Sequence, residues 1–427
     1  MKIRFKNARI LTMSEGEPIF IGELHVEGNR ISYVGEGRKE FDEIEWDREV
    51  ECKGNLIMPG FKNAHTHSAM TFLRSFAEDV PLLEWLHEKV FPMEAKLEGD
   101  DIYHLSKLAI MEYLTSGITA NFDMYFSPDQ VAKASVDCGF RTVMCGSIND
   151  FVGDIDFLEN SYITYNQYHD LISYQLGCHA EYTTSKDRIL GIAALSQKYK
   201  APVYLHLSET KEEVQQCVER YGMTPTVFLD QCGLFEYGGG GYHCVHMSEE
   251  DFVVFKEKNL FVISNPGSNC KLASGVAPLT KMLEMGIPVA LGTDGPASNN
   301  CLDMFREMFL ATALQKITLQ DATALSANEV LKMATVQGAN AMCLPDCDVL
   351  QIGKLADLIV IDLMQPNMQP MNDVVKNIVF SGSKQNVSLT MVNGKILYEN
   401  GQFYIGSKPE EIYQKANEII QKIRSLM

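Results

Sequence analysis

Two histidines, His65 and His67, stand one residue apart in the segment PGFKNAHTHSAM. An apolar stretch leads into this segment and predicts a β-strand, on which side chains two residues apart point to the same side. Such a pair can hold a metal ion between its imidazoles. Two unrelated histidines at the end of a strand are an equally good interpretation of the motif when it is considered alone.

Two further candidate ligands favour the metal interpretation. His206 lies in PVYLHLSET and Asp294 in VALGTDGPASNN, and each follows a short apolar run that predicts a strand. Three imidazoles and one carboxylate leave a coordination position for water, as in catalytic rather than structural metal sites. We therefore predict one divalent ion held by His65, His67, His206 and Asp294. Zinc is the expected ion, and iron, manganese and nickel accept the same ligands.

The strands that must present these residues belong to a repeating pattern. Short apolar runs alternate with stretches whose apolar residues recur at helical spacing, which is typical of parallel βαβ units. The runs are NLIMPGFKNAHTH, GITANFDM, RTVMCGS, YQLGCHAEY, PVYLHLSET, GYHCVHM, FVISNPGS and IPVALGTDG. They predict an α/β fold of the (β/α)₈ TIM-barrel type, whose active sites lie at the carboxyl ends of the strands. The alternative is an open doubly wound sheet, but no G-x-G-x-x-G follows any run. Gly238 to Gly241 are interpreted as a flexible loop before the sixth strand.

The two ends of the chain carry similar hairpin patterns. GELHVEGNRISYVGEG and VSLTMVNGKILYENGQ both alternate apolar and polar residues on either side of a Gly-Asn or Asn-Gly turn. We predict that residues 1–57 and 347–427 form one small β-sandwich domain with a C-terminal helix, and that residues 58–346 form the barrel. An accidental likeness between two common hairpins is the alternative.

Composition and charge limit the partners. The formal net charge of −19 repels nucleic acid and anionic membrane surfaces. No apolar run approaches the roughly 20 residues that span a bilayer. The eleven cysteines show no paired C-x-x-C spacing, which fits reduced thiols better than disulfides. We expect a cytoplasmic protein that binds neither nucleic acid nor membrane.

The motifs PGFKNAHTHSAMT, HLSET, HCVHM, SNPGSN and LGTDGPASNN, in this order and spacing, resemble those of the amidohydrolase superfamily. More narrowly, the chain is similar to the 5-methylthioadenosine/S-adenosylhomocysteine deaminases, a branch that includes triazine chlorohydrolases. The resemblance covers essentially the whole chain. It implies a metal-dependent aminohydrolase with the four ligands named above, and a homo-oligomer is compatible with it. A single metal ion is implied, because the fourth strand ends at His179 without a lysine; a part for Glu181 stays open.

The resemblance also implies catalytic roles. Asp294 would bind the ion and accept the proton of the attacking water. Glu209, in H-x-x-E after His206, would deliver a proton to the ring nitrogen beside the attacked carbon; a carboxylate favoured by a helix N-terminus is the alternative. His243 would orient the hydroxide and stabilise charge on the new oxygen. His246 would be its packed neighbour, since alternation along a strand lets only one of the two face the barrel interior.

Substrate contacts are implied for four residues. In the nucleoside deaminases that the chain resembles, a tryptophan and a glutamate after the first strand contact the nucleoside, which points to Trp85 and Glu94. A carboxylate that accepts two hydroxyl hydrogen bonds recognises a ribose diol. His179 and Ser298 match further contacts. The alternatives are a core tryptophan, a solvated helix glutamate, a structural histidine and a helix-capping serine.

The absence of arginine from one segment bears on the charge of the substrate's 5′ group. From Thr142 to Asp187 the chain has no arginine, whereas relatives that accept S-adenosylhomocysteine bind its carboxylate there with arginines. Glu181 adds a negative charge, and both features disfavour an anionic tail. The resemblance thus implies hydrolytic deamination of an adenosine-type nucleoside, namely 5′-methylthioadenosine, 5′-deoxyadenosine, adenosine or S-adenosylhomocysteine, with a neutral 5′ group favoured. The alternatives are an amino- or chlorohydrolase of guanine, another purine, a pterin or a triazine, and a metal-free scaffold or binding protein.

Overall fold

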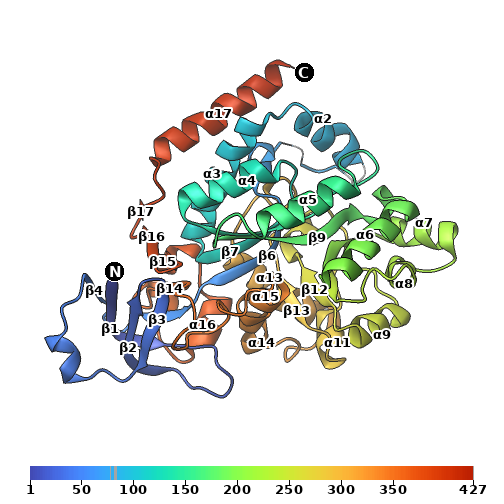
Figure 1. The fold of residues 1–427 in the computed structure, drawn as a ribbon. Coiled ribbons are helices and arrows are strands. Elements are labelled where there is room, and N and C mark those ends of the chain that lie inside the picture. Colours follow the sequence, from blue (N-terminus) through green and yellow to red (C-terminus); the bar gives the residue numbers. More distant parts are fainter. Residues whose placement is uncertain (77, 81–83, 427) are drawn as a thin grey trace.

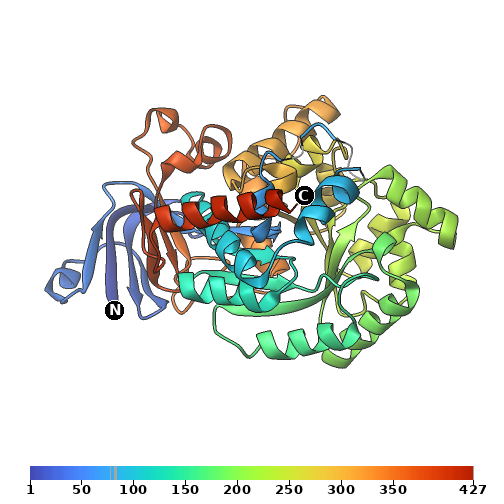
Figure 2. The same ribbon diagram turned by 90° about the horizontal axis from the view of Figure 1, so that it is seen from above.

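The computed structural model describes residues 1–76, 78–80 and 84–426. Its larger part is a barrel of eight parallel strands surrounded by helices, and a smaller sheet built from both chain ends lies beside it (Figures 1 and 2). The predicted fold class, an α/β barrel with a small β domain formed from the two ends, is confirmed. The residue limits given above for the two domains stay a prediction.

The barrel strands follow one another around the barrel in sequence order and pair in parallel. They are β6 Phe61–Thr66, β7 Ile118–Asp123, β8 Arg141–Cys145, β9 Ile172–Ala180, β10 Val203–Leu207, β11 Gly239–His243, β12 Phe261–Ser264 and β13 Val289–Leu291. The last strand meets the first through the backbone N–H groups of Thr293 and Asp294, which donate to the carbonyl of His65 at 3.1 and 3.0 Å. Closure of the barrel therefore brings a carboxylate of the last unit beside a histidine of the first.

Helices fill the connections between the strands and cover the outside of the barrel (Figure 1). They are α3 Gly99–Thr115, α4 Pro128–Cys138, α5 Ile155–Tyr165, α6 Lys186–Tyr199, α7 Lys211–Tyr221, α8 Pro225–Gln231, α9 Glu249–Glu257, α10 Pro266–Lys271, α11 Leu279–Glu284, α12 Pro296–Asn299, α13 Met304–Leu319, α14 Ala327–Ala334 and α15 Val336–Ala341. The long connection after β6 holds the 3-10 helix η2 Ser68–Leu73, the π-helix η3 Trp85–Val90 and the short helix α2 Phe91–Glu94. The turn η4 Glu181–Thr183 follows β9.

Glycine explains two differences from the predicted strands. NLIMPGFKNAHTH is two strands rather than one, because β5 Leu56–Pro59 belongs to the smaller sheet and the barrel strand β6 begins after Gly60. The expected loop over Gly238 to Gly241 is also wrong, because three of these glycines form most of β11. A Cβ on Gly240 would lie 2.2 Å from the carbonyl oxygen of Phe261, so the strand packs against its neighbours only without side chains.

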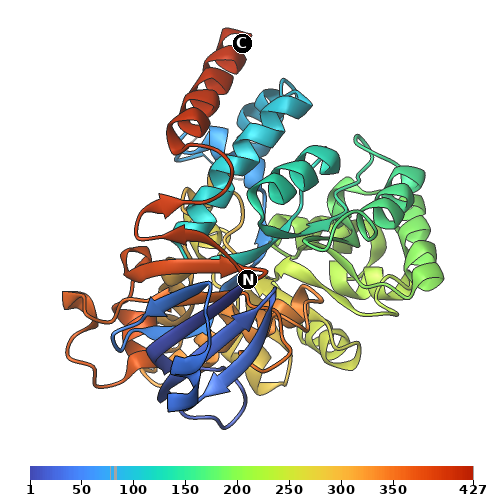
Figure 3. The same cartoon turned by 60° about the vertical axis from the view of Figure 1, so that its left-hand side comes forward.

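The smaller sheet joins both chain ends (Figure 3). Its strands are β1 Lys2–Ile10, β2 Phe20–Glu27, β3 Arg30–Gly35, β4 Arg48–Glu51, β5, β14 Leu358–Ile361, β15 Val387–Val392, β16 Lys395–Glu399 and β17 Gln402–Phe403. Both predicted hairpins are present, as β2–β3 and β15–β16. They are not two separate sheets, since β1, β5 and β14 connect them into one nine-stranded sheet. Side chains from both halves, such as Phe5 and Met391, nevertheless share one core.

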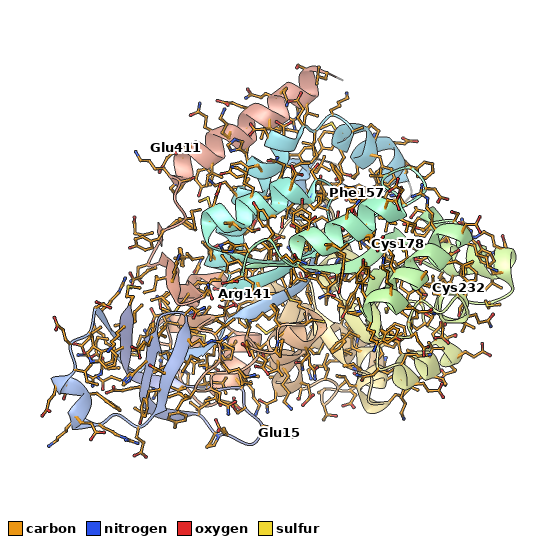
Figure 4. The ribbon with its side chains drawn as sticks, viewed as in Figure 1. Glu15, Arg141, Phe157, Cys178, Cys232 and Glu411 are labelled. Atoms are coloured by element: carbon orange, nitrogen blue, oxygen red, sulfur yellow. The ribbon has the colours of Figure 1, made fainter. Side chains whose placement is uncertain are left out.

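The remaining elements lie in the connections between the strands of the smaller sheet and after its last strand. They are the 3-10 helices η1 Lys39–Glu43, η5 Pro366–Met368 and η6 Lys384–Asn386, and the helices α16 Val374–Phe380 and α17 Pro409–Ser425. Arg141 at the start of β8 lies where barrel and sheet meet (Figure 4), and its guanidinium donates to both carboxylate oxygens of Asp357 at 2.7 and 3.2 Å. Helix α17 packs along α3, where Lys422 donates to Asp101 at 2.6 Å. None of the described helices is long and apolar enough to cross a membrane.

Candidate metal centre and active site

Three of the four predicted ligands, His65, His206 and Asp294, come together with His243 at the carboxyl ends of the barrel strands, and the fourth, His67, is outside that group. One nitrogen each of His65, His206 and His243 and one carboxylate oxygen of Asp294 all lie within 4.8 Å of one another, and all four residues are buried. These residues belong to β6, β10, β11 and the segment just after β13. Residues that lie far apart in the sequence are therefore close enough to share one cation.

His67 lies beside this group. Its Nε2 is 3.2 Å from Oδ1 of Asp294, and its ring centroid is 4.8 Å from that of His65 and 5.3 Å from that of His206. Nδ1 of His67 is hydrogen bonded to the carbonyl of Met124, and Nδ1 of His206 to the carbonyl of His179 at 2.7 Å. Because one nitrogen of each ring is held by the backbone, the other is turned toward the cluster.

Asp294 is held by hydrogen bonds on both oxygens. Oδ2 accepts from the hydroxyls of Ser268 and Ser298, each at 2.7 Å, and Oδ1 accepts from the N–H of Gly295 at 2.7 Å. Its backbone has φ = 58°, a left-handed conformation that non-glycine residues seldom adopt. Ser298 lies inside α12, and the side chain of Asp303 caps the following helix, so the helix-cap alternative for Ser298 is wrong. Its predicted contact with the substrate stays a prediction.

The donor set fits a divalent cation. His65 is fully buried and neither ring nitrogen has a hydrogen-bond partner, although Nε2 lies 3.5 Å from Oδ1 of Asp294. Burial lowers the pKa of His65 to about 3 and that of His206 well below the usual range, so both rings are neutral. Although burial opposes it, the rings of His65 and His67 hold the pKa of Asp294 well below its ordinary value. Although burial opposes it, Asp294 raises the pKa of His67 to about 9, so this ring would lose a proton on binding a metal ion. Neutral imidazoles and an ionised carboxylate are the forms that bind a metal ion, and an unpartnered buried imidazole is otherwise costly.

Glu209 and His243 lie at the edge of the cluster. Nε2 of His243 is 3.8 Å from Oε2 of Glu209 and 3.9 Å from Oδ2 of Asp294. Nδ1 of His243 is hydrogen bonded to Oδ1 of Asn269 at 2.8 Å, which fixes the ring. Glu209 is buried, its Oε1 accepts from the hydroxyl of Ser274 at 3.3 Å, and burial raises its pKa. Glu209 directly precedes Thr210, the N-cap of α7, so the helix N-terminus stays an alternative reason for a carboxylate there. A buried acid of raised pKa nevertheless suits proton transfer near neutral pH.

The side chain of His246 is bonded to the backbone of Ser274 and is not part of the cluster, but strand alternation is not the reason. Its Nε2 is hydrogen bonded to the carbonyl of Ser274 at 2.7 Å. Strand β11 ends at His243, and His243 and Cys244 have φ values of 71° and 50°. Strand alternation therefore does not extend to His246, and the chain turns instead.

Three predicted substrate contacts lie on neighbouring elements. Glu94, at the end of α2, is 9 % exposed and its Oε1 accepts from the hydroxyl of Tyr125 at 2.7 Å, so it is not a solvated helix charge. Burial raises its pKa to about 7. His179 lies with its ring centroid 4.9 Å from that of His206, and its Nδ1 is hydrogen bonded to the hydroxyl of Thr183. Trp85 is buried in the main hydrophobic core, as its alternative interpretation requires. Substrate contact by all three stays a prediction.

Glu181 is neutralised by a partner that the sequence did not indicate. It is 2 % exposed, and Oε2 accepts from Nη2 of Arg220 on α7 at 2.6 Å. It is therefore not a free negative charge, and that part of the argument about the 5′ group is wrong. Glu181 is also absent from the candidate ligand group among the described residues.

Several supporting residues were missed by the sequence reasoning. Ser268 and Asn269 belong to the quoted motif SNPGSN, which was a usable signal for their contacts with Asp294 and His243. Ser274 and Tyr125 follow no motif and could only be found from the fold.

A barrel with such a ligand set at the carboxyl ends of its strands is typical of metal-dependent hydrolases, and this chain is one. The family model described as Amidohydrolase family matches residues 56–397, and the chain belongs to that family. It is 37 % identical over 435 residues to a 5-methylthioadenosine/S-adenosylhomocysteine deaminase of Thermoanaerobacter pseudethanolicus, covering 99 % of this chain and 100 % of the relative.

Solved structures agree with the fold. An adenosine deaminase from Xanthomonas campestris with bound zinc has a TM-score of 0.93 at 30 % identity, covering 99 % of this chain and 98 % of that one. An atrazine chlorohydrolase from Arthrobacter aurescens complexed with zinc has a TM-score of 0.90 at 23 % identity, covering 98 % and 100 %. The second likeness supports the fold alone.

Proposed function

We propose that the protein hydrolyses the exocyclic C–N bond of an adenosine-type nucleoside, giving the inosine-type product and ammonia. The observation that carries this proposal is the buried group of His65, His206, His243 and Asp294 with Glu209 at its edge. The names of the relatives, which match nearly the whole length of the chain, supply the substrate class.

His65, His67, His206 and Asp294 would hold the divalent ion. When bound there, the ion would lower the pKa of water from 15.7 toward about 7, so that hydroxide would be available as the nucleophile at neutral pH. We propose zinc, since the adenosine deaminase of similar structure contains it. A metal-free scaffold is disfavoured because every predicted ligand is present in the cluster or beside it.

The protein groups divide the proton transfers. Asp294 accepts a proton from the attacking water, since it is ionised and turned toward the cluster. Glu209, which burial keeps protonated to higher pH, donates to the ring nitrogen beside the attacked carbon and makes that carbon electrophilic. His243, whose Nδ1–H donates to Oδ1 of Asn269, is placed to orient the attacking water and, when Nε2 also carries a proton, to stabilise charge on the new oxygen. A second proton transfer to the amino group releases ammonia.

Glu94 is proposed to bind the ribose. Tyr125 occupies one acceptor position of its carboxylate, and an ionised carboxylate offers about four, so positions remain for two hydroxyls. A guanine, pterin or triazine substrate would not need such a group.

We further propose that the 5′ group is neutral. The absence of arginine from Thr142 to Asp187 supports this, because no guanidinium of that segment can meet a carboxylate. Arg220 is already paired with Glu181, so it is not an obvious substitute.

Ammonia release from a panel of substrates tests the proposal. We expect the highest kcat/KM for 5′-methylthioadenosine, 5′-deoxyadenosine or adenosine. A clear preference for S-adenosylhomocysteine would refute the neutral 5′ group, and turnover of guanine, a pterin or a triazine without turnover of any nucleoside would refute the substrate class.

We also propose a cytoplasmic location. All eleven cysteines are free, as expected in a reducing compartment. Assembly into a homo-oligomer and the lack of nucleic-acid binding stay predictions.

A further inference from the structure

The segment that carries Glu209 makes a sharp turn after β10. Ser208, the first residue after the strand, has φ = 50°, and this left-handed conformation is unfavourable for a residue with a Cβ. Such a turn persists only when its surroundings hold it. It redirects the chain between His206, on the strand, and Glu209, which lies beside His243.

The carboxylate of Glu213 holds this turn. Oε1 accepts from the backbone N–H of Ser208 and Oε2 from that of Glu209, both at 2.8 Å. Glu213 is 5 % exposed, so both bonds are shielded from water. Glu213 lies in the first turn of α7, and its backbone N–H donates to the side-chain hydroxyl of Thr210, the N-cap residue, at 3.2 Å. In a capping box the third residue of a helix bonds back to the N-cap N–H, whereas the hydrogen bonds of Glu213 reach the two residues before the cap.

The same turn is joined to the strand that carries His243. The carbonyl of Ser208 accepts from the N–H groups of Val245 and His246 at 3.0 and 2.8 Å, and the carbonyl of Leu207 accepts from Cys244 at 3.0 Å. The turn is therefore held on one side by Glu213 and on the other by the segment after β11. A shift of this turn would move Glu209 relative to His243.

We propose that Glu213 is a positioning residue for the deamination, whose carboxylate holds the left-handed turn at Ser208 and so aims Glu209 at the substrate ring. The proposal rests on the function proposed for Glu209. Glu213 acts through the backbone and does not touch the reacting atoms. Ordinary helix capping would stabilise α7 without favouring proton delivery, and this difference can be measured.

The central variant is Glu213→Gln, which keeps the size of the side chain but presents an amide NH₂ group to one of the two N–H groups. Asp251→Asn is the matched control, because Asp251 is a fully buried carboxylate that closes the capping box of α9 without bonding the backbone of a predicted catalytic residue. For each variant kcat, KM, metal content and melting temperature are measured with 5′-methylthioadenosine or the best nucleoside found.

We expect Glu213→Gln to lower kcat roughly 10- to 100-fold, as small displacements of a catalytic group do. Its KM should stay within about twofold of the wild-type value and its metal content should not change, and Asp251→Asn should keep kcat within about twofold. In a protein that already carries Glu209→Gln, adding Glu213→Gln should lower kcat by less than about twofold, because the proton donor that Glu213 positions is already removed.

The role is refuted if kcat is unchanged in folded Glu213→Gln, or if the loss is equally large in the Glu209→Gln background. Should Glu213→Gln not fold, Glu213→Asp replaces it: its shorter arm retains the charge but not both bonds, so the same loss of kcat is expected and wild-type kcat refutes the role. Wild-type protein that releases no ammonia from any nucleoside refutes the proposed function itself, which is a separate result.

Discussion

Discrimination by the 2′-hydroxyl of the substrate should depend on Glu94. A hydrogen bond to a charged acceptor contributes about 1.5–3 kcal/mol, and every 1.4 kcal/mol is about tenfold in kcat/KM. Glu94 is only 9 % exposed and Tyr125 already fixes one oxygen, so little is lost in ordering the carboxylate. We expect adenosine to exceed 2′-deoxyadenosine in kcat/KM by roughly 10- to 150-fold.

Glu94→Gln keeps the volume of the side chain and replaces the charged acceptor with a neutral one, whose hydrogen bonds contribute about 0.5–1.5 kcal/mol. The ratio of the two kcat/KM values should then fall below about tenfold. Steady-state rates of ammonia release for both substrates with both proteins give the ratio. Free adenine serves as control, because it has no ribose and should react equally with the two proteins.

The same ratio should depend on pH. Burial raises the pKa of Glu94 to about 7, so the carboxylate gains a proton as the pH falls through about 7 and loses acceptor capacity. Preference for the ribonucleoside should therefore decrease below that pH, and the titration of Glu209 cancels because both substrates require it. The hydrogen bond from Tyr125 lowers the pKa of Glu94, so Tyr125→Phe should move the midpoint to higher pH. A ratio that is unaffected by Glu94→Gln and flat with pH would refute ribose recognition by this carboxylate.

Three further predictions concern the metal ion, the proton donor and the join between barrel and sheet. Removal of the ion with a chelator should abolish ammonia release and lower the melting temperature. Adding the ion back at 1,000 times its Kd should raise the free energy of unfolding by about 4 kcal/mol. Activity that survives complete removal of the ion would contradict the metal site. Glu209→Gln should lower kcat roughly 10²- to 10⁴-fold at unchanged metal content, whereas a kcat within twofold would exclude it as the proton donor. Arg141→Met should lower the free energy of unfolding in urea by about 3–5 kcal/mol, because Asp357 is left buried without its partner. Adding Asp357→Leu should recover part of that loss, and a variant as stable as the wild type would show that the pair contributes nothing.

The barrel could be predicted because its signals are local. Each apolar run reports a strand, and residues at the ends of parallel strands must meet at one edge of a barrel whatever their distance in sequence. Strand order alone therefore predicts that His65, His206 and Asp294 meet, and the three are found together.

The glycines of β11 show where local signals fail. A run of glycine has no side chains, so its sequence indicates flexibility. In the barrel the same absence lets β11 lie against both neighbours, since a Cβ on Gly239 would stand 1.9 Å from the carbonyl oxygen of Val203. The restriction comes from the neighbouring strands, which the sequence of the run does not contain.

The charge of Glu181 could not be judged from its own segment for a similar reason. Whether a carboxylate repels a substrate depends on its partners, and Arg220 comes from a helix in the next βα unit. Asp294 illustrates the same dependence, because its two serine donors follow different strands. Residue types and strand order therefore predict which groups meet, whereas the hydrogen bonds that set their charge and direction come from the loops. Selection for another substrate in this fold can consequently act on residues such as Tyr125 or Arg220 while every metal ligand stays unchanged.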